Sequence, residues 1–129
     1  IVLDRQLRIP KESALFDGKV KTILFSEEKN ASELEKFQKK NLIIDFLDFE
    51  KPVPQQICDE LFKHHIQSVI IEGGAKTLQS FIESDLWDEA RVFTGENEFI
   101  NGVKAPDFSA EKISEETIGS DNLKIFKND

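Results

Sequence analysis

The sequence predicts a single α/β domain built around a mostly parallel sheet. Short apolar runs alternate along the chain with segments of helical periodicity, the pattern of parallel α/β folds. One of these runs leads directly into paired glycines and then a helix. Near the C-terminus, two strand-like segments flank a turn sequence and predict an antiparallel edge. A chain of 129 residues suits one domain, so we assign 1–129 to it.

The first elements are two strands and a short helix. Residues 1–4 form an apolar strand stub, and the β-branched run 20–25 predicts a second strand. Ser32 and Glu35 match a capping box, with Ser at the N-cap and Glu three positions later, which predicts a helix extending to about Lys40. The residues expected on its buried side are Leu34 and Phe37.

A second strand–helix pair precedes the central strand. Residues 41–47 form an apolar strand, and Pro52 and Pro54 mark the start of the next helix. The apolar positions of that helix follow the helical period: Ile57, Cys58, Leu61, Phe62 and His65. The run 69–71 is uninterrupted in its apolar character and predicts a fully buried central strand.

The remaining elements close the domain. A third helix follows the glycines, with one apolar face: Leu78, Phe81, Ile82 and Leu86. Residues 89–94 alternate in polarity and predict another strand. Residues 113–118 and 123–126 predict a hairpin, because Gly119-Ser-Asp-Asn122 between them has turn composition.

Composition excludes several functional classes. A net charge of −8 disfavours nucleic-acid binding, which requires a basic face. No apolar run reaches the roughly 20 residues of a membrane span, so we expect no membrane partner and a cytoplasmic location. Cys58 is the only cysteine, and the adjacent His64 and His65 point in different directions on a helix, so no metal site is predicted.

Glu72-Gly73-Gly74 is the strongest candidate site. The glycines lie between the predicted central strand and the third helix, where free backbone amides and the positive helix end favour a phosphate. Glu72 would place a carboxylate at the end of an apolar strand, which requires a partner or a ligand. The alternative is a tight turn in which glycine supplies only backbone freedom. Ala75 replaces the last glycine of a phosphate loop, which weakens an ATPase interpretation.

Arg5 is a second candidate. It follows the first strand, where a guanidinium could bind a phosphate through two hydrogen bonds. The alternative, which the sequence alone favours, is a solvated loop charge. Residues 27–30 (Glu-Glu-Lys-Asn) are likewise interpreted as a solvated loop.

Several motifs resemble one known family. In chain order they are Val2-Leu-Asp4, Leu7-Arg-Ile-Pro10, Val69-Ile-Ile-Glu-Gly-Gly-Ala75, Phe81-Ile82, Leu86-Trp-Asp-Glu89 and Gly102-Val-Lys-Ala-Pro106. Together they resemble the reductase domain of the bifunctional riboflavin-biosynthesis deaminase–reductase, which has the dihydrofolate-reductase-like fold, a three-layer sandwich. The strand ending in Glu-Gly-Gly and the helix after it are the most specific of these motifs.

The resemblance implies an activity and a set of binding residues. The reaction would be NADPH-dependent reduction of 5-amino-6-(5-phosphoribosylamino)uracil to its ribitylamino counterpart, without a metal. Glu72 falls where the family contacts the substrate, and Arg5 falls near the adenosine side of the cofactor, where it would contact the 2′-phosphate. The residues that fall on the cofactor-binding turn and the first helical turns are Gly74, Ala75, Lys76, Thr77, Leu78, Gln79 and Ser80.

The departures from the family also produce expectations. Family reductase domains carry further N-terminal strands, and none of the motifs found here identifies a catalytic residue. We therefore expect this chain to be an incomplete, inactive part of a reductase that self-associates, most simply as a homodimer. The alternatives are a dihydrofolate-reductase-like paralogue with another substrate and a non-catalytic nucleotide-binding or dimerisation module.

Overall fold

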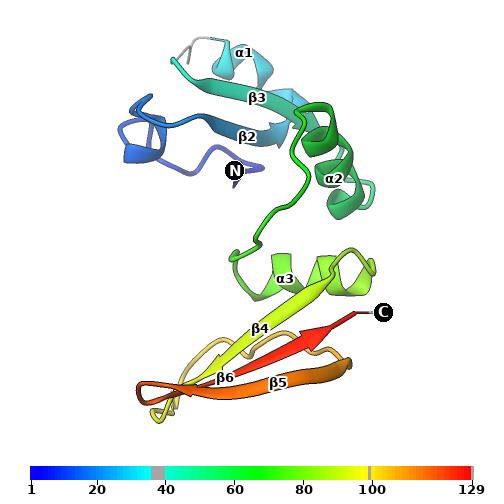
Figure 1. The fold of residues 1–129 in the computed structure, drawn as a ribbon. Helices are drawn as coiled ribbons and strands as arrows, with labels where there is room; N and C mark the ends of the chain where they lie inside the picture. Colours follow the sequence, from blue (N-terminus) through cyan, green and yellow to red (C-terminus); the bar gives the residue numbers. More distant parts are fainter. Residues whose placement is uncertain (36–39, 99, 129) are drawn as a thin grey trace. The chain divides into compact units, whose positions relative to one another are not determined.

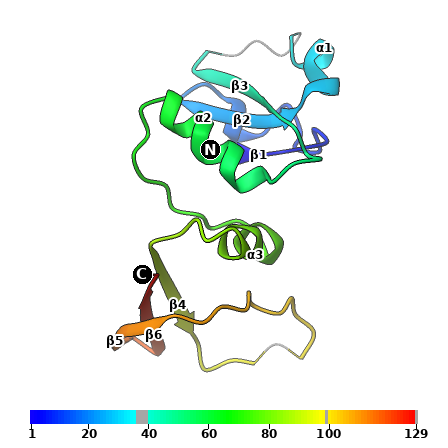
Figure 2. The same ribbon diagram turned by 90° about the vertical axis from the view of Figure 1, so that its right-hand side faces the viewer.

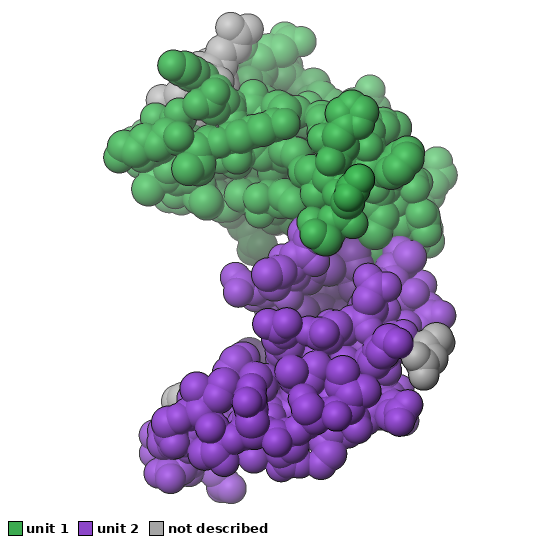
Figure 3. Space-filling view, in the orientation of Figure 1, with its two compact units in different colours: residues 1–68 green, residues 69–129 purple. Residues whose placement is uncertain are grey.

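The computed structural model describes residues 1–35, 40–98 and 100–128. The chain divides into two compact units, Ile1–Ser68 (unit 1) and Val69–Asp129 (unit 2), which are coloured separately in Figure 3. Each unit has its own three-stranded sheet. The two units are described one at a time, and the assignment of 1–129 to a single domain stays a prediction.

Unit 1 contains a parallel sheet. Its strands are β1 (Val2–Leu3), β2 (Thr22–Glu27) and β3 (Leu42–Leu47), in the spatial order β1-β2-β3 (Figure 1). Val2 pairs with Leu24, and the β2–β3 register runs from Thr22 opposite Leu42 to Glu27 opposite Leu47. Because all three strands run in one direction, their carboxyl ends lie along one edge of the sheet.

The centre of unit 1 is β2. Its first five residues are buried, which explains the uninterrupted apolar run: a central strand covered on both faces has no solvent side. Leu24 forms a core cluster with Phe16 and Leu34, and partly buried side chains pack against this cluster: Val2, Leu7, Ile9, Leu42 and Ile44. Phe16 comes from the 3₁₀ turn η1 (Ala14–Phe16).

The predicted capping box is wrong. A 3₁₀ turn, η2 (Glu28–Asn30), leads directly into α1 (Ala31–Leu34), so the N-cap is Asn30 and Ser32 lies inside the helix. Asn30 does not cap the helix, because its amide donates to the Arg5 carbonyl and the Ser26 hydroxyl instead. Leu34 is buried as predicted. The predicted contact of Phe37 lies outside the described residues.

Helix α2 (Val53–Lys63) packs against β3 (Figure 2). Its buried residues are Pro54, Ile57 and Leu61. The prediction that Phe62 and His65 lie on the buried face is wrong: Phe62 is 78% exposed and His65 is exposed. His65 lies past the helix end with a φ of 60°, which turns its side chain off the helical face. His64 instead contacts the sheet, with Nε2 2.7 Å from Asp45 Oδ2.

The predicted central strand at 69–71 is also wrong in this structure. Residues 66–74 have no strand or helix assignment, and Ile70 is 85% exposed. A strand exists only when its backbone groups pair with a neighbour. Within the described residues, no strand pairs with this segment, so its apolar character alone does not produce one. Glu72 is therefore exposed and needs no buried partner.

Unit 2 combines α3 (Ala75–Glu83) with an antiparallel sheet. The strands β4 (Glu89–Thr94), β5 (Glu111–Ile118) and β6 (Asp121–Lys127) have the spatial order β4-β6-β5. The predicted hairpin is confirmed: β5 and β6 pair across a turn in which Gly119 has a φ of 65°. Helix α3 buries Phe81 and half-buries the other three predicted apolar positions.

An aromatic cluster joins the parts of unit 2. The Phe108 ring makes edge contacts with Trp87 and Phe126, with ring centroids 5.6 and 5.0 Å apart. The prediction of an α/β fold with parallel strands and an antiparallel C-terminal hairpin is confirmed, although β4 also belongs to the antiparallel part. None of the described helices is long and apolar enough to cross a membrane.

Candidate functional site

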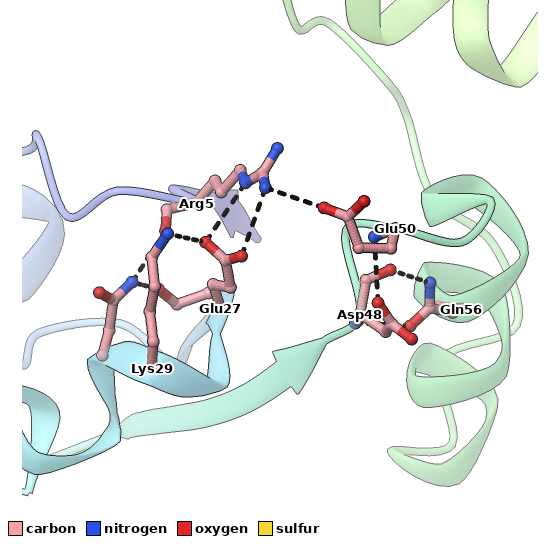
Figure 4. Close-up of polar contacts among 8 residues, drawn as sticks. Arg5, Glu27, Lys29, Asp48, Glu50 and Gln56 are labelled. Carbon is pink, nitrogen blue, oxygen red and sulfur yellow. Dashed lines mark hydrogen bonds and ion pairs between the residues drawn. The ribbon is translucent and has the colours of Figure 1, made fainter.

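Unit 1 offers one candidate site at the carboxyl edge of its parallel sheet. Ligands of open α/β sheets bind beyond the carboxyl ends of the strands. Three segments meet at this edge because their strands are parallel: the loop after β1, the turn after β2 and the loop after β3. The charged side chains of these segments form the cluster shown in Figure 4.

The loop after β1 is fixed by Asp4. Its buried carboxylate accepts hydrogen bonds from the backbone N–H groups of Arg8 (3.0 Å) and Ile9 (2.8 Å). These bonds close a tight loop in which Leu7 takes a φ of 51°, a strained value for leucine. The Ser26 hydroxyl donates to the Asp4 carbonyl at 3.0 Å. The loop therefore holds the Arg5 backbone in one position.

The Arg5 guanidinium pairs with acids from both neighbouring strands. Its Nε and Nη2 atoms donate to the two Glu27 carboxylate oxygens at 3.3 Å each, and Nη2 lies 3.6 Å from Glu50 Oε1 (Figure 4). The guanidinium also lies over the Phe49 ring, 5.0 Å from its centroid. Lys29 adds a second cation, with Nζ 2.6 Å from Glu27 Oε2. Arg5, Lys29, Glu27 and Glu50 are called the Arg5 cluster below.

Hydrogen bonding sets the charge state of this cluster. Bonds from Arg5 and then Lys29 hold the pKa of the Glu27 carboxyl below its ordinary value, so Glu27 is ionised at neutral pH. The hydrogen bond to Glu27 raises the pKa of Arg5 above its already high ordinary value. The cluster thus contains two cations and two anions and carries no net charge.

The loop after β3 positions Glu50. The Gln56 side chain exchanges two hydrogen bonds with the backbone of Asp48, at 2.9 and 2.8 Å, which folds the loop onto the first turns of α2. The Asp48 carboxylate accepts from the Glu50 N–H at 3.0 Å and pairs with Lys51. The bond from Lys51, followed by that from the Glu50 amide, lowers the pKa of Asp48.

Unit 2 offers a second candidate site at the start of α3. Gly74 is the N-cap, with φ −53° and ψ 165°, and no side chain caps the helix. A Cβ at Gly74 would meet nothing within 4 Å, whereas one at Gly73 would lie 3.3 Å from Thr77 Cβ. Within the described residues, the amides of Ala75 and Lys76 have no protein acceptor. The turn is therefore exposed and has donors available for an anion.

The predicted cofactor residues differ in what they already contact. Gln79 is engaged, because its side chain donates to the Asp107 carbonyl at 3.2 Å and accepts from the Asp107 N–H at 2.9 Å. Ser80 is engaged with the Thr77 carbonyl at 2.7 Å, and Leu78 is half-buried. Glu72, Gly74 and Lys76 are exposed. The open part of this site is thus the segment 72–77.

Sequence reasoning missed most of the Arg5 cluster. Glu27 was assigned to a solvated loop, but it is the last residue of β2 and the main partner of Arg5. A signal was present: an acid directly follows a buried apolar strand, the same pattern that singled out Glu72. Glu50 gave no local signal, because only the parallel pairing of β2 and β3 brings its loop to this edge.

Metal ligands are not gathered in either unit. Among the described residues, no group of three or more His, Cys, Asp or Glu side chains is arranged to hold a metal ion. Burial raises the pKa of the half-buried Cys58 thiol, which favours its uncharged form.

Comparison with protein families identifies the chain. The model of the RibD C-terminal domain matches residues 1–95, about three quarters of the sequence. The chain belongs to the RibD C-terminal domain family. No curated protein matched the sequence. The predicted resemblance to the reductase part of a riboflavin-biosynthesis enzyme is confirmed at the level of the family.

Solved structures support the same fold. Two crystal forms of Acinetobacter baumannii RibD match with TM-scores of 0.75 and 0.74 at 18% identity, over 98% of this chain and 36% of theirs. A pyrimidine reductase-like protein from Corynebacterium diphtheriae matches with a TM-score of 0.74 at 13% identity, over 97% of this chain and 58% of its own. This RibD C-terminal domain sequence therefore spans about a third of the RibD chains that share its fold.

Proposed function

We propose that this chain is part of a reductase of riboflavin biosynthesis that uses NADPH to reduce 5-amino-6-(5-phosphoribosylamino)uracil. In this reaction the ribosyl group, in its open-chain or imine form, gains a hydride at C1 and a proton, and becomes the ribityl chain. The membership of the RibD C-terminal domain family carries the proposal. The open start of α3 supports it, because a dinucleotide phosphate requires such a site.

The roles of individual residues follow from their chemistry. We assign the dinucleotide phosphates to the amides of Ala75 and Lys76, with the Lys76 ammonium adding positive charge at the same helix end. Glu72 would accept hydrogen bonds from substrate hydroxyl or amino groups. When bound, NADPH supplies the hydride, and the protein supplies binding and orientation. We assign Arg5 to the adenosine side of the cofactor.

Gly74 gives a direct test of cofactor binding. Gly74→Val places a side chain in open space at the helix start, so the helix is retained while the approach of a phosphate is blocked. We expect NADPH affinity to fall about tenfold or more, measured by titrating the fluorescence of the reduced nicotinamide. Gly95→Val is the matched control, because a Cβ there meets only Asp121 Oδ1, at 3.5 Å. Equal NADPH affinity in the two variants would contradict the assignment.

Turnover tests the rest of the proposal. The ribosylaminopyrimidine is mixed with NADPH and the protein, and oxidation of the nicotinamide is followed by absorbance. Reduction to the ribitylamino product is expected from the protein that contains this sequence together with the remaining RibD-like segments. Binding of NADPH without reduction would instead favour the non-catalytic nucleotide-binding module.

We also propose that the protein forms homodimers through the edge of the unit 2 sheet. β5 pairs with β6 on one side only, and all eight of its residues are exposed, including Ile113 and Ile118. An unpaired edge with exposed apolar side chains favours strand-to-strand association. Sedimentation should show a dimer that weakens in Ile118→Lys, and a monomer at all concentrations would contradict this proposal.

A further inference from the structure

We infer that Glu27 and Glu50 set the cofactor choice of this protein by neutralising Arg5, so that NADH and NADPH bind with similar affinity. This inference rests on the proposed function and concerns the carboxyl edge of the unit 1 sheet. It goes beyond the assignment of Arg5 to the adenosine side, because it concerns the two acids that occupy its guanidinium.

The two dinucleotides differ in one group on the adenosine ribose. NADPH carries a 2′-phosphate, and NADH carries a 2′-hydroxyl. In dinucleotide-binding α/β folds, an acid beyond a strand end accepts a hydrogen bond from the ribose hydroxyl, whereas an arginine accommodates the phosphate. Selection of NADPH therefore requires a cation that is free to pair with the phosphate.

Arg5 is not such a free cation. Glu27 occupies two of its donors in a forked arrangement at 3.3 Å, and Glu50 approaches a third position at 3.6 Å. Glu27 is itself fixed: its side chain is only 20% exposed, and Lys29 holds it from the other side at 2.6 Å. The Arg5 side chain is nevertheless 43% exposed, so a ligand can reach the cluster.

The charge balance decides between the two ligands. A 2′-phosphate that pairs with Arg5 must displace Glu27 and remain close to two carboxylates, so its attraction to Arg5 is largely cancelled. A ribose hydroxyl adds no charge and donates to a carboxylate oxygen that is already in place. The cluster therefore gives NADPH little advantage, and the anions that cause this are Glu27 and Glu50.

Glutamine substitutions test the inference. Dissociation constants for NADPH and NADH are measured on the purified protein by titration calorimetry, and the ratio of NADPH affinity to NADH affinity is compared among variants. We expect a wild-type ratio below about tenfold and a rise of about tenfold in Glu27→Gln, which keeps the shape of the side chain and removes its charge. Glu28→Gln is the matched control, because Glu28 is the exposed neighbouring acid; its ratio should stay at the wild-type value.

Two further variants keep the test independent of folding. The Glu50 side chain is 86% exposed, so Glu50→Gln leaves the fold intact and should raise the ratio in the same direction by roughly threefold. Arg5→Ala leaves the two acids unbalanced and should lower the ratio by about tenfold. Combining Arg5→Ala with Glu27→Gln should return the ratio towards the wild-type value.

The outcomes separate this inference from the proposed function. If neither dinucleotide binds, both are overturned. If both bind but the wild-type protein favours NADPH tenfold or more, the inference alone is overturned. The same holds if Glu27→Gln and Glu50→Gln both leave the ratio unchanged.

Discussion

Unit 1 and unit 2 build three-stranded sheets of similar size by opposite means. In unit 1 the central strand β2 is almost fully buried and all pairing is parallel. In unit 2 the edge strand β5 is exposed along its whole length and all pairing is antiparallel. The sequences reflect this difference, because β2 is a continuous apolar run whereas β5 contains four charged residues among its eight.

The two candidate sites differ in the same way. The Arg5 cluster of unit 1 is already satisfied by its own ion pairs, so a ligand must compete with them. The start of α3 in unit 2 has exposed, uncapped amides. Compared together, the two regions show that a charged cluster sets selectivity, whereas an open helix end supplies affinity for an anion.

Core truncation in unit 1 should give the largest effect. Leu24→Ala removes a fully buried side chain from the cluster with Phe16 and Leu34, and should lower the free energy of unfolding by about 2–5 kcal/mol. Ile113→Ala on the exposed β5 should lower it by less than about 1 kcal/mol. Urea denaturation followed by far-ultraviolet circular dichroism measures both changes.

Trp87 sharpens this comparison. It is the only tryptophan and lies in unit 2, so its fluorescence reports on that unit. If the units are stabilised separately, Leu24→Ala should move the dichroism transition and leave the Trp87 transition in place. A coincident shift of both transitions would show one cooperative domain.

Loss of the Asp4 carboxylate should give the next largest effect. Asp4→Ala leaves the buried amides of Arg8 and Ile9 without acceptors, and should lower the free energy of unfolding by about 1–3 kcal/mol. The control in unit 2 is Asp107→Ala, because the Asp107 side chain is exposed and its backbone bonds to Gln79 are retained. Equal losses in the two variants would mean that the Asp4 loop contributes little to stability.

Glycine at two helix ends should increase stability by a smaller amount. α2 and α3 both end with a residue in the left-handed region, His65 (φ 60°) and Asp85 (φ 56°). The turns match, because the Ile66 N–H donates to the Leu61 carbonyl, as the Leu86 N–H does to the Phe81 carbonyl.

His65→Gly should therefore raise the free energy of unfolding by about 1 kcal/mol. Asp85→Gly should gain less, because it also removes the acceptor of the Asn128 side-chain amide, 2.7 Å away. Thermal denaturation measures both changes. A larger gain for Asp85→Gly would contradict the structural role given to that hydrogen bond.

The smallest expected effect is a pH dependence at the Arg5 cluster. Because the folded pKa of Glu27 is lowered, its ion pairs stabilise the protein above the ordinary carboxyl pKa, and this stability is lost as the pH falls through the folded value. Glu27→Gln should show a shallower loss of stability on acidification than Glu28→Gln. Parallel acid profiles for the two variants would exclude a contribution from the Glu27 pairs.

Local sequence patterns were most reliable where one element accounts for its own burial. The strands β2, β3 and β4, the helix α3 and the hairpin at Gly119 were all predicted close to their observed positions. The capping box at Ser32 was wrong because a preceding 3₁₀ turn had already started the helix. Phe62 was misplaced because the helical period assigned to the buried face a residue that the sheet does not cover.

The sequence by itself determined the alternation of strands and helices, the exposed glycine turn before α3 and membership of the RibD C-terminal domain family. These depend on local composition and on the order of motifs along the chain. Tertiary structure alone decided that 69–71 is unpaired and that Glu27 and Glu50 converge on Arg5. The physical reason is that strand pairing and charge neutralisation depend on which distant segments become neighbours, which no local pattern specifies.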